Sequence, residues 1–281
     1  MKILILGASG FLGSNVFELM KYNKDFNVLG TCNNSTDNYD LIKLDITNEH
    51  EVKTLINKFN PDVILWSLIS DMKNNKSEKY LIEIGLNNVL KNLSPEQKLI
   101  FISTNAIFRG GNGYYKETDM PKYRNSNKSL AEYVNAKIDG EKLVKRHSNH
   151  IIVRPGAIYG KYTEGRWDKR ISLLIEQLES GKEIVRTKNL YNTFVNVDEL
   201  AKAIKKLIEI DYKGIIHLGP ILKESYYNFY IKIAKKLNLN VNLIKSNMLT
   251  HEEIIKDDGT LDLSIDTSMA RELLGDIFSN I

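Results

Sequence analysis

The sequence contains a single cysteine, Cys32, little net charge and no long apolar run. One thiol cannot form an internal disulfide, so a disulfide-stabilised secreted fold is excluded and a cytoplasmic protein is expected. The N-terminal run ILILG, residues 3–7, is too short for a signal-peptide core or a membrane span, so no membrane partner is expected. A net charge of only +4 over 281 residues argues against a nucleic-acid partner.

The rest of the composition is that of a globular protein, with 42% hydrophobic and 26% charged residues. Short apolar runs alternate with amphipathic stretches such as residues 13–22 and 49–59. This alternation predicts an α/β fold, a doubly wound parallel sheet with helices on both faces and the first strand inside the sheet. The expected strands of this sheet lie at residues 2–7, 26–32, 40–46, 62–68, 98–104 and 150–156.

Three glycines follow the first expected strand at three-residue steps. A strand that ends in glycine and continues as a helix directs unpaired N–H groups outward, and the helix dipole adds partial positive charge there. Glycine also lets a diphosphate approach the backbone. The pattern predicts a dinucleotide site of the Rossmann type, and a purely structural turn is the alternative. Its residues would be Gly7, Ser9, Gly10, Phe11, Leu12 and Gly13.

The pattern loosens after about residue 160, with helices expected at 170–180, 198–210 and 226–237 and a strand at 215–219. We expect a dinucleotide-binding domain over residues 1–160 and a smaller C-terminal α/β substrate-binding region over 161–281. Residues 191–220 are expected to pack back on the first domain. Ligands of doubly wound sheets bind at the carboxyl ends of the strands, so the second region should lie there.

Tyr133 and Lys137 are four residues apart in a helical pattern over 129–144, which places them on one helix face. An ammonium group near a phenol lowers the pKa of the phenol. Such a tyrosine can donate a proton to a carbonyl oxygen while hydride reaches the carbonyl carbon. Ser103 and Thr104 end an expected strand and can place a hydroxyl against a substrate oxygen. The alternatives are a solvated helix face and an ordinary polar strand end.

These motifs resemble the extended short-chain dehydrogenase/reductase superfamily, and within it the dTDP-4-dehydrorhamnose reductases and their sugar-nucleotide relatives. The resemblance covers nearly the whole chain. It implies NAD(P)H-dependent reduction of a keto group on a nucleotide-activated sugar, expected to be a 4-keto-6-deoxy sugar, in surface polysaccharide precursor synthesis. The motifs that carry it include GASGFLG (7–13), STNAIFRGG (103–111), YVNAK (133–137), RPGAIYG (154–160), VNVDELAKAI (195–204) and GIIHLG (214–219).

By this resemblance Thr104, Tyr133 and Lys137 match the catalytic trio. Asp45 would contact the adenine amino group, and a strand-end turn is the alternative for it. Residues 31–35, TCNNS, contain neither an acid that would repel a 2′-phosphate nor an arginine that would bind one, so NADP is favoured and NAD is the alternative. No metal is expected. The further cofactor contacts implied are Asn33, Ile46, Ser67, Leu68 and Pro155, together with Tyr133 and Lys137.

The expected sugar pocket departs from the family. Asn105-Ala106 replaces the usual Asp-Tyr, and Ala157 stands where rhamnose-forming members carry a tryptophan. Asn105, Trp167 and Arg170 are the expected substrate contacts, since a cation would meet the diphosphate of a nucleotide sugar. For Trp167 and Arg170, a solvated loop and helix start is the alternative. The sequence leaves open whether the protein is a homodimer.

Two other functions stay open. One is a sugar-nucleotide epimerase of the same superfamily, which would keep its cofactor bound through turnover. The other is a non-catalytic, cofactor-binding regulatory protein, because the regulatory subunit of methionine adenosyltransferase is similar in fold. The intact Thr104, Tyr133 and Lys137 argue against a non-catalytic role.

Overall fold

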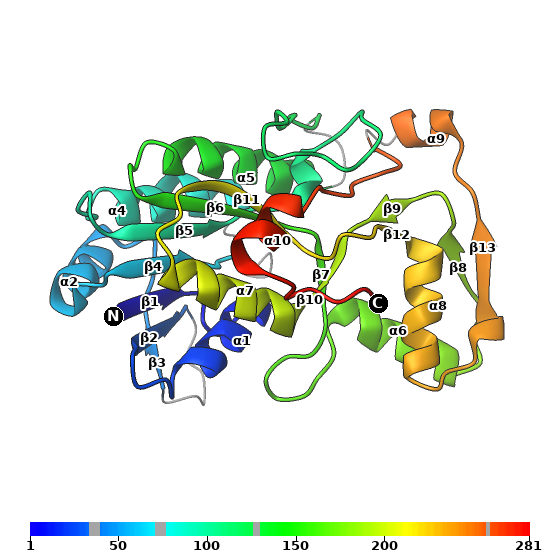
Figure 1. The fold of residues 1–281 in the computed structure, drawn as a ribbon, viewed down its shortest axis with the longest axis horizontal. Coiled ribbons are helices and arrows are strands. Elements are labelled where there is room, and N and C mark those ends of the chain that lie inside the picture. Colours follow the sequence, from blue (N-terminus) through cyan, green and yellow to red (C-terminus); the bar gives the residue numbers. More distant parts are fainter. Residues whose placement is uncertain (34–39, 71–76, 126–129, 257–258) are drawn as a thin grey trace.

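The computed structural model describes residues 1–33, 40–70, 77–125, 130–256 and 259–281, and a single parallel sheet forms its centre. Its seven strands follow the order β11-β6-β5-β4-β1-β2-β3, the predicted doubly wound arrangement (Figure 1). The first strand lies between β4 and β2, which confirms that it is inside the sheet. The strands are β1 (Lys2–Leu6), β2 (Asn27–Cys32), β3 (Leu41–Lys43), β4 (Val63–Trp66), β5 (Lys98–Ile102), β6 (His150–Pro155) and β11 (Gly214–Leu218).

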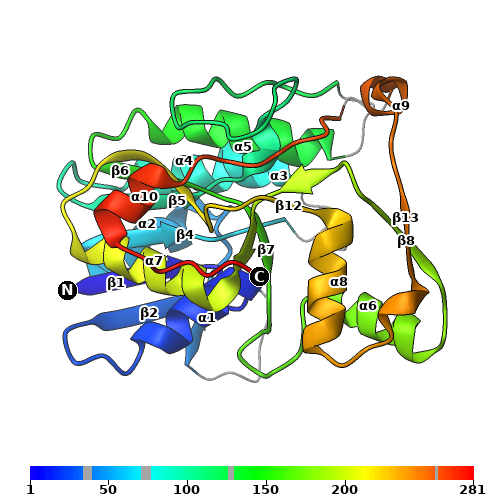
Figure 2. The same ribbon diagram turned by 45° about the vertical axis from the view of Figure 1, so that its right-hand side comes forward.

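Helices cover both faces of the sheet because its strands are apolar on both sides. In β1, Ile3 and Ile5 pack with one helical layer, whereas Leu4 and Leu6 pack with the other. Figure 2 shows the two layers on opposite sides of the sheet. The first layer contains α1 (Phe11–Met20), α7 (Val197–Glu209) and α10 (Ser268–Leu274), and the second contains α2 (Glu49–Phe59), α4 (Asn87–Leu90) and α5 (Ala131–Val144).

A continuous helical run precedes β5 on the second face. It consists of α3 (Glu78–Tyr80), a π-helical segment η2 (Leu81–Leu86) and α4. Gly85 lies so close to the loop after β3 that a Cβ atom there would be 3.0 Å from Cγ2 of Ile46. The run therefore packs tightly against a loop that leaves the carboxyl edge of the sheet.

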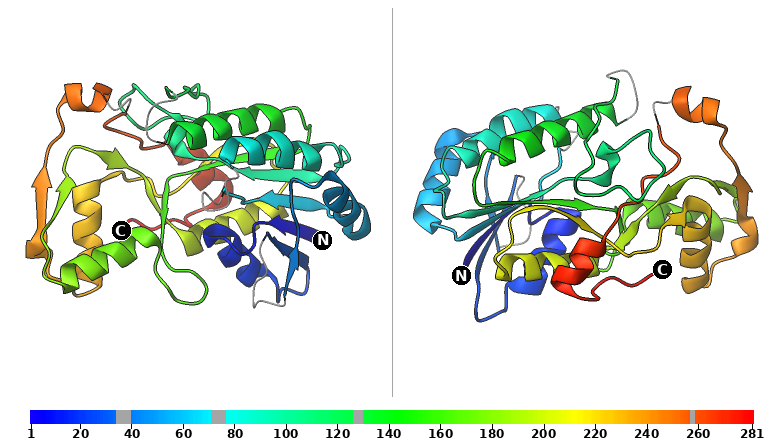
Figure 3. Two further views of the ribbon diagram at one scale, coloured as in Figure 1. Left: turned by 180° about the vertical axis from the view of Figure 1, so that it is seen from behind. Right: turned by 45° about the horizontal axis from the view of Figure 1, so that its top comes forward.

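The C-terminal region extends beyond that edge (Figure 3). Its core contains the stacked rings of Phe194 and Phe229, whose centroids are 3.9 Å apart. Three two-stranded sheets pair β7 with β10, β9 with β12 and β8 with β13. The elements are β7 (Ala157–Tyr159), α6 (Lys169–Glu179), β8 (Ile184–Thr187), β9 (Tyr191–Asn192), β10 (Phe194–Asn196), β12 (Glu224–Ser225), α8 (Tyr226–Lys236), η4 (Val241–Leu243), β13 (Ile244–Asn247) and α9 (His251–Lys256).

The predicted and observed elements agree most closely where the pattern is long. Helix α2 has the predicted bounds, and α1 begins two residues earlier than expected, at Phe11. The paired strands of the C-terminal region were not predicted, because runs of two to four residues are too short to show periodicity. Residues 197–218 return to the large sheet as α7 and β11. The division into two domains at residue 160 stays a prediction.

Candidate active site

A cleft of about 710 Å³ opens at the carboxyl edge of the sheet, where β1 turns into α1. Gly7 has a φ of +89°, a conformation that favours glycine. Gly10 is the N-cap of α1 and supplies no side-chain acceptor to the helix. The N–H groups of the first turn thus have no side-chain cap, as an anion site at a helix N-terminus requires. Five of the six predicted residues of this turn line the cleft, namely Gly7, Ser9, Gly10, Phe11 and Leu12.

Gly13, the sixth, does not line the cleft but packs behind it. A Cβ atom on Gly13 would lie 2.1 Å from the carbonyl oxygen of Gly7 and 2.7 Å from Oγ of Ser67. The close approach of α1 to the sheet therefore depends on the absence of a side chain at Gly13. Its position fits a packing role rather than direct contact with a ligand.

The ends of β2 and the loop after β3 form the next wall of the cleft, through Thr31, Cys32, Asn33, Asp45 and Ile46. The Asp45 carboxylate accepts a 2.6 Å hydrogen bond from the Thr47 hydroxyl, so the turn holds this side chain. Asn34 and Ser35, whose neutral character supported NADP, lie outside the described residues.

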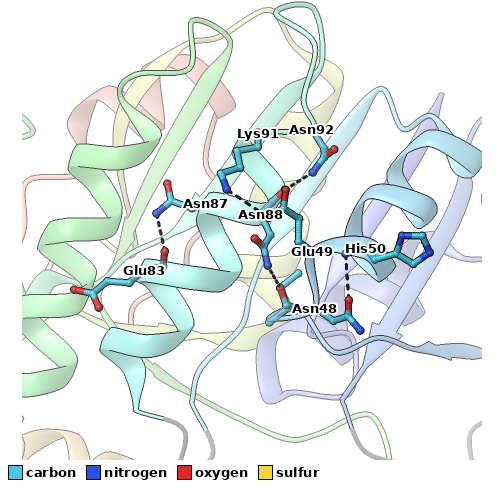
Figure 4. Close-up of polar contacts among 9 residues, drawn as sticks. Asn48, Glu49, His50, Glu83, Asn87, Asn88, Lys91 and Asn92 are labelled. Carbon is cyan, nitrogen blue, oxygen red and sulfur yellow. Dashed lines mark hydrogen bonds and ion pairs between the residues drawn. The ribbon is translucent and has the colours of Figure 1, made fainter.

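Polar contacts between helices hold this wall in place. Asn88 of α4 donates a buried 3.1 Å hydrogen bond to the carbonyl oxygen of Ile46 (Figure 4). Asn48 caps α2 by accepting from the backbone of His50. Lys91 Nζ and Glu49 Oε2 join the two helices at the surface, 3.5 Å apart. These contacts set the position of Ile46 relative to the cleft.

Tyr133 and Lys137 lie on one face of α5, as predicted, and both line the cleft. The ammonium group of Lys137 lies 5.7 Å from the centroid of the Tyr133 ring. Burial raises the pKa of Tyr133, while the charge of Lys137 and a hydrogen bond with Thr104 lower it. Burial has the larger effect, so the phenol is protonated at neutral pH. Ser67 and Leu68, at the end of β4, also line the cleft beside these residues.

Thr104 follows β5 and does not itself line the cleft, although Ser103 does. The Thr104 hydroxyl accepts a 3.1 Å hydrogen bond from the backbone of Ala106, which caps the short helix η3 (Asn105–Ile107). The same side chain acts on Tyr133 and lowers the pKa of its phenol. The hydroxyl of Ser103 is instead directed to Glu141, at 2.6 Å. Of the two adjacent hydroxyls, that of Thr104 is the one that acts on the predicted acid.

The predicted substrate residues and Pro155 lie outside this cleft. Asn105 is buried, and its amide group donates to Oδ1 of Asn192 at 2.6 Å and to the carbonyl oxygen of Leu263 at 2.7 Å. Asn105 thus ties the sheet edge to the C-terminal region. Pro155 ends β6, where it pairs with β11. Neither residue lines the cleft.

Trp167 lies in the loop before α6, and Arg170 lies in the first turn of that helix. Neither residue lines the cleft, but others from the preceding segment do. The ammonium group of Lys161 lies 4.9 Å from the Trp167 ring, and Arg170 donates to the carbonyl oxygen of Ile158. Ile158 and Tyr162 line the cleft, and the Tyr162 ring packs on Phe11 at 4.7 Å. The sequence does not indicate Ile158 or Tyr162 as site residues, because an isolated aliphatic or tyrosine residue gives no signal.

Glu78 is a further residue that the sequence did not indicate. Its carboxylate lies 3.1 Å from Nζ of Lys137, and both side chains are only 2% exposed. The negative charge of Glu78 raises the pKa of Tyr133, although less than burial does. Glu78 lies in a separate helix, so no motif connects it with Tyr133 and Lys137.

Within the described ranges, no helix is long and apolar enough to cross a membrane, and no three His, Cys, Asp or Glu side chains are grouped so that they could hold a metal ion. One fold can carry many unrelated functions, so function has to be argued from the site.

The methionine adenosyltransferase 2 subunit beta of Danio rerio is 26% identical over 251 residues, which cover 85% of this chain and 74% of that protein. A structure described as a hypothetical dTDP-4-dehydrorhamnose reductase from Sulfolobus tokodaii has a TM-score of 0.80 and 27% identity, covering 100% of this chain and 98% of that one. The dTDP-4-dehydrorhamnose reductase of Bacillus anthracis, solved with NADP, has a TM-score of 0.76 and 23% identity, covering 96% of this chain and 91% of that one.

The family model for the NAD dependent epimerase/dehydratase family matches residues 3–219. That match includes the glycine turn at the start of α1, the end of β5 and the Tyr133–Lys137 face of α5. It spans more than half of the chain, and the predicted superfamily resemblance is thereby confirmed. The chain belongs to the NAD dependent epimerase/dehydratase family.

Proposed function

We propose that this protein is an NADP-dependent reductase that acts on a keto group of a nucleotide-activated sugar, with Thr104, Tyr133 and Lys137 as its catalytic residues. One observation carries the proposal: the glycine turn from Gly7 to Leu12 and the pair Tyr133–Lys137 line the same cleft. The anion-binding and proton-donating parts of a dehydrogenase site therefore open into one space. The reductase name of the Sulfolobus tokodaii relative supports the same reaction class.

The residues of the site support one assignment of chemical roles. A reduced nicotinamide cofactor, when bound, supplies the hydride for the carbonyl carbon. Tyr133 donates its phenolic proton to the carbonyl oxygen. Thr104, which does not itself line the cleft, acts on the Tyr133 phenol and lowers its pKa. Lys137 stabilises the phenolate that remains and holds a ribose hydroxyl. A phenol whose pKa is raised by burial is protonated at neutral pH, as reduction requires.

For the cofactor we propose NADP, with NAD as the alternative. The described end of β2 presents Thr31, Cys32 and Asn33 to the cleft, and none of these is a carboxylate that would repel a 2′-phosphate. The NADP bound by the Bacillus anthracis relative supports this choice. We place the reaction in the cytoplasm, because the free and buried Cys32 suits a reducing compartment.

For the substrate we propose a 4-keto-6-deoxy sugar nucleotide used in polysaccharide precursor synthesis, with dTDP-4-dehydrorhamnose not the best one. Asn105 uses its amide group inside the protein, and Ala157 offers no ring to a sugar. A pocket without the family's carboxylate, phenol and indole is less suited to the rhamnose precursor. Trp167 and Arg170 remain proposed contacts, since the segment that precedes them in the chain contributes Tyr162 to the lining of the cleft.

The test is oxidation of NADPH by the purified protein with dTDP-, UDP- and GDP-linked 4-keto sugars, followed by loss of reduced-nicotinamide absorbance. We expect stoichiometric oxidation with at least one sugar and a lower kcat/KM for dTDP-4-dehydrorhamnose than for the best substrate. A folded protein that binds NADPH but does not oxidise it with any of these sugars would refute the reductase proposal. A sugar interconversion without net oxidation, with cofactor retained after purification, would point to an epimerase.

A second candidate is a non-catalytic regulatory protein. The observation that favours it is the 26% identity with the Danio rerio methionine adenosyltransferase 2 subunit beta over 85% of this chain. Size-exclusion chromatography with a methionine adenosyltransferase catalytic subunit separates the two proposals. Complex formation without sugar reduction would favour the regulatory role.

A further inference from the structure

The buried pair of Glu78 and Lys137 has a geometry that the family motif does not describe. Lys137 Nζ lies 3.1 Å from Oε1 of Glu78, and each side chain is 2% exposed. The other carboxylate oxygen, Oε2, accepts a 2.7 Å hydrogen bond from the backbone N–H of Ser70. Burying two charges is costly unless they are paired and hydrogen-bonded. Glu78 is therefore paired through Oε1 and hydrogen-bonded through Oε2.

The contacts of Lys137 fix the direction of its ammonium group. An ammonium has three N–H donors. One is directed to the carbonyl oxygen of Leu68 at 3.3 Å. Oε1 of Glu78 lies 3.1 Å from Nζ and pairs with it by charge, without hydrogen-bond geometry. The group also lies 5.2 Å from the centroid of the Phe101 ring. Because Lys137 lines the cleft, its ammonium group can also donate to a group bound there.

The charge of Glu78 also acts on Tyr133. The groups that act on the phenol are Lys137 on its own helix, Glu78 on α3 and the Thr104 hydroxyl after β5. A second buried ion pair joins Arg154 to Glu141, with Nη2 and Oε2 2.7 Å apart. Its two opposite charges offset each other. Burial is the main cause of the raised pKa of Tyr133, and the carboxylate of Glu78 raises it further, against the effect of Lys137.

We propose that Glu78 is a positioning residue for the reductase reaction, which holds the ammonium group of Lys137 toward the cleft and offsets its charge so that Tyr133 keeps its proton until a carbonyl oxygen takes it. This inference rests on the proposed function. It assigns Glu78 a role without contact with the reacting atoms. Without the carboxylate, the full charge of Lys137 would act on Tyr133 and release its proton at lower pH.

The test uses Glu78→Gln, which keeps the shape of the side chain and removes its charge. Tyrosinate absorbance is titrated with NADP⁺ bound, and the Tyr133 signal is the difference between each protein and the same protein carrying Tyr133→Phe. An uncompensated opposite charge at this range shifts a pKa by about 1 unit or more. We expect the Tyr133 midpoint to fall by about that amount in Glu78→Gln and to stay near the wild-type value in Glu78→Asp.

The matched control is Glu83→Gln in the adjoining segment η2. Glu83 is 55% exposed and pairs with Lys79 at 3.5 Å, so its charge lies in solvent. We expect no change of the midpoint in this variant. An unchanged midpoint in a folded Glu78→Gln protein would overturn the proposal.

If Glu78→Gln does not fold, Lys137→Met is compared with the double variant Lys137→Met/Glu78→Gln, which leaves no unpaired buried charge. The midpoint should be lower in the double variant, and equal midpoints would overturn the proposal. The titration requires no sugar substrate. A shifted midpoint with no reductase activity would therefore refute the proposed function alone, whereas activity with an unshifted midpoint would refute only the role of Glu78.

Discussion

Polar residues beneath the cleft form a connected buried network. Glu141 accepts hydrogen bonds from Ser103 at 2.6 Å and from Arg154 at 2.7 and 2.9 Å. Arg154 also donates to the backbone of Glu117, whose carboxylate accepts from the N–H of His217. The network supports the end of β5, from which Thr104 extends. Each of its charges has a partner, so loss of one member leaves another buried without compensation.

His217 makes this network sensitive to acid. Burial, aided by the nearby charge of Arg154, lowers the pKa of His217 to about 4. In the unfolded chain a histidine binds its proton near pH 6.5. As the pH falls from about 6.5 to 4, the unfolded state gains a proton that the folded state does not, so stability decreases over that window. The full loss is about 3 kcal/mol.

The measurement is urea unfolding of the wild type and His217→Asn at pH 7 and pH 4.5. We expect a smaller loss of unfolding free energy in the variant, because acidic groups elsewhere contribute equally to both proteins. His50→Asn, at an exposed position of α2, is the control and should resemble the wild type. Equal losses in wild type and His217→Asn would contradict the prediction.

Tyr133 is the residue on which the proposed chemistry depends. Tyr133→Phe removes one oxygen and keeps the ring, so the cleft retains its shape. We expect turnover with the best sugar substrate to fall by about 100-fold or more, the usual contribution of a general acid. NADPH affinity, measured by fluorescence titration, should be retained. Near-normal turnover would mean that Thr104 or water supplies the proton.

At the scale of elements, the junction of β1 and α1 contains two glycines with different roles. Gly10 has an ordinary φ of −82°, and a Cβ atom there would lie 3.2 Å from the Gly7 carbonyl oxygen, a tight contact. At Gly13 the same atom would overlap that oxygen at 2.1 Å. One glycine therefore leaves space for a ligand, and the other allows the helix to pack on the sheet.

Gly10→Val and Gly13→Ala should separate these roles. We expect Gly10→Val to fold but to lose NADPH affinity, because its methyl groups occupy the start of the cleft. We expect Gly13→Ala to lower the free energy of unfolding by about 1–3 kcal/mol or more through overpacking. Fluorescence titration and urea unfolding of both variants test this, and unchanged NADPH affinity in Gly10→Val would argue against a diphosphate at this turn.

At the scale of the whole molecule, cofactor binding should stabilise the fold. The cleft is lined by residues of β2, β5, α1 and α5 and of the segments that follow β1 and β4, so a bound dinucleotide joins elements from distant parts of the chain. A ligand at 100 times its Kd adds about 2.7 kcal/mol to the stability of the state that binds it. Cofactor choice is therefore measurable without knowledge of the sugar.

We expect NADPH to raise the Tm more than NADH does at equal concentration. The described end of β2 presents no carboxylate to the cleft, so the 2′-phosphate meets no repulsion there. Gly10→Val, which should lose affinity for both cofactors, serves as the control. A larger shift with NADH would show that Asn33 serves the free 2′-hydroxyl instead.

Local pattern in the sequence was sufficient to predict much of the molecule. The apolar runs predicted the strands of the central sheet, and helical spacing placed Tyr133 and Lys137 on one face of α5. The glycine steps predicted the turn before α1. These features depend on residues that are near one another in the chain, where backbone geometry alone determines which side chains share a face.

Only the tertiary structure brought distant residues together. Glu78 meets Lys137 because α3 packs against α5, and Asn105 meets Asn192 because the C-terminal region folds over the sheet edge. Tyr162 reaches Phe11 by the same long-range folding. A lone glutamate, asparagine or tyrosine has no local pattern that reveals its partner. Its surroundings arise from packing between elements, and that packing decides whether such a residue tunes the site or supports it.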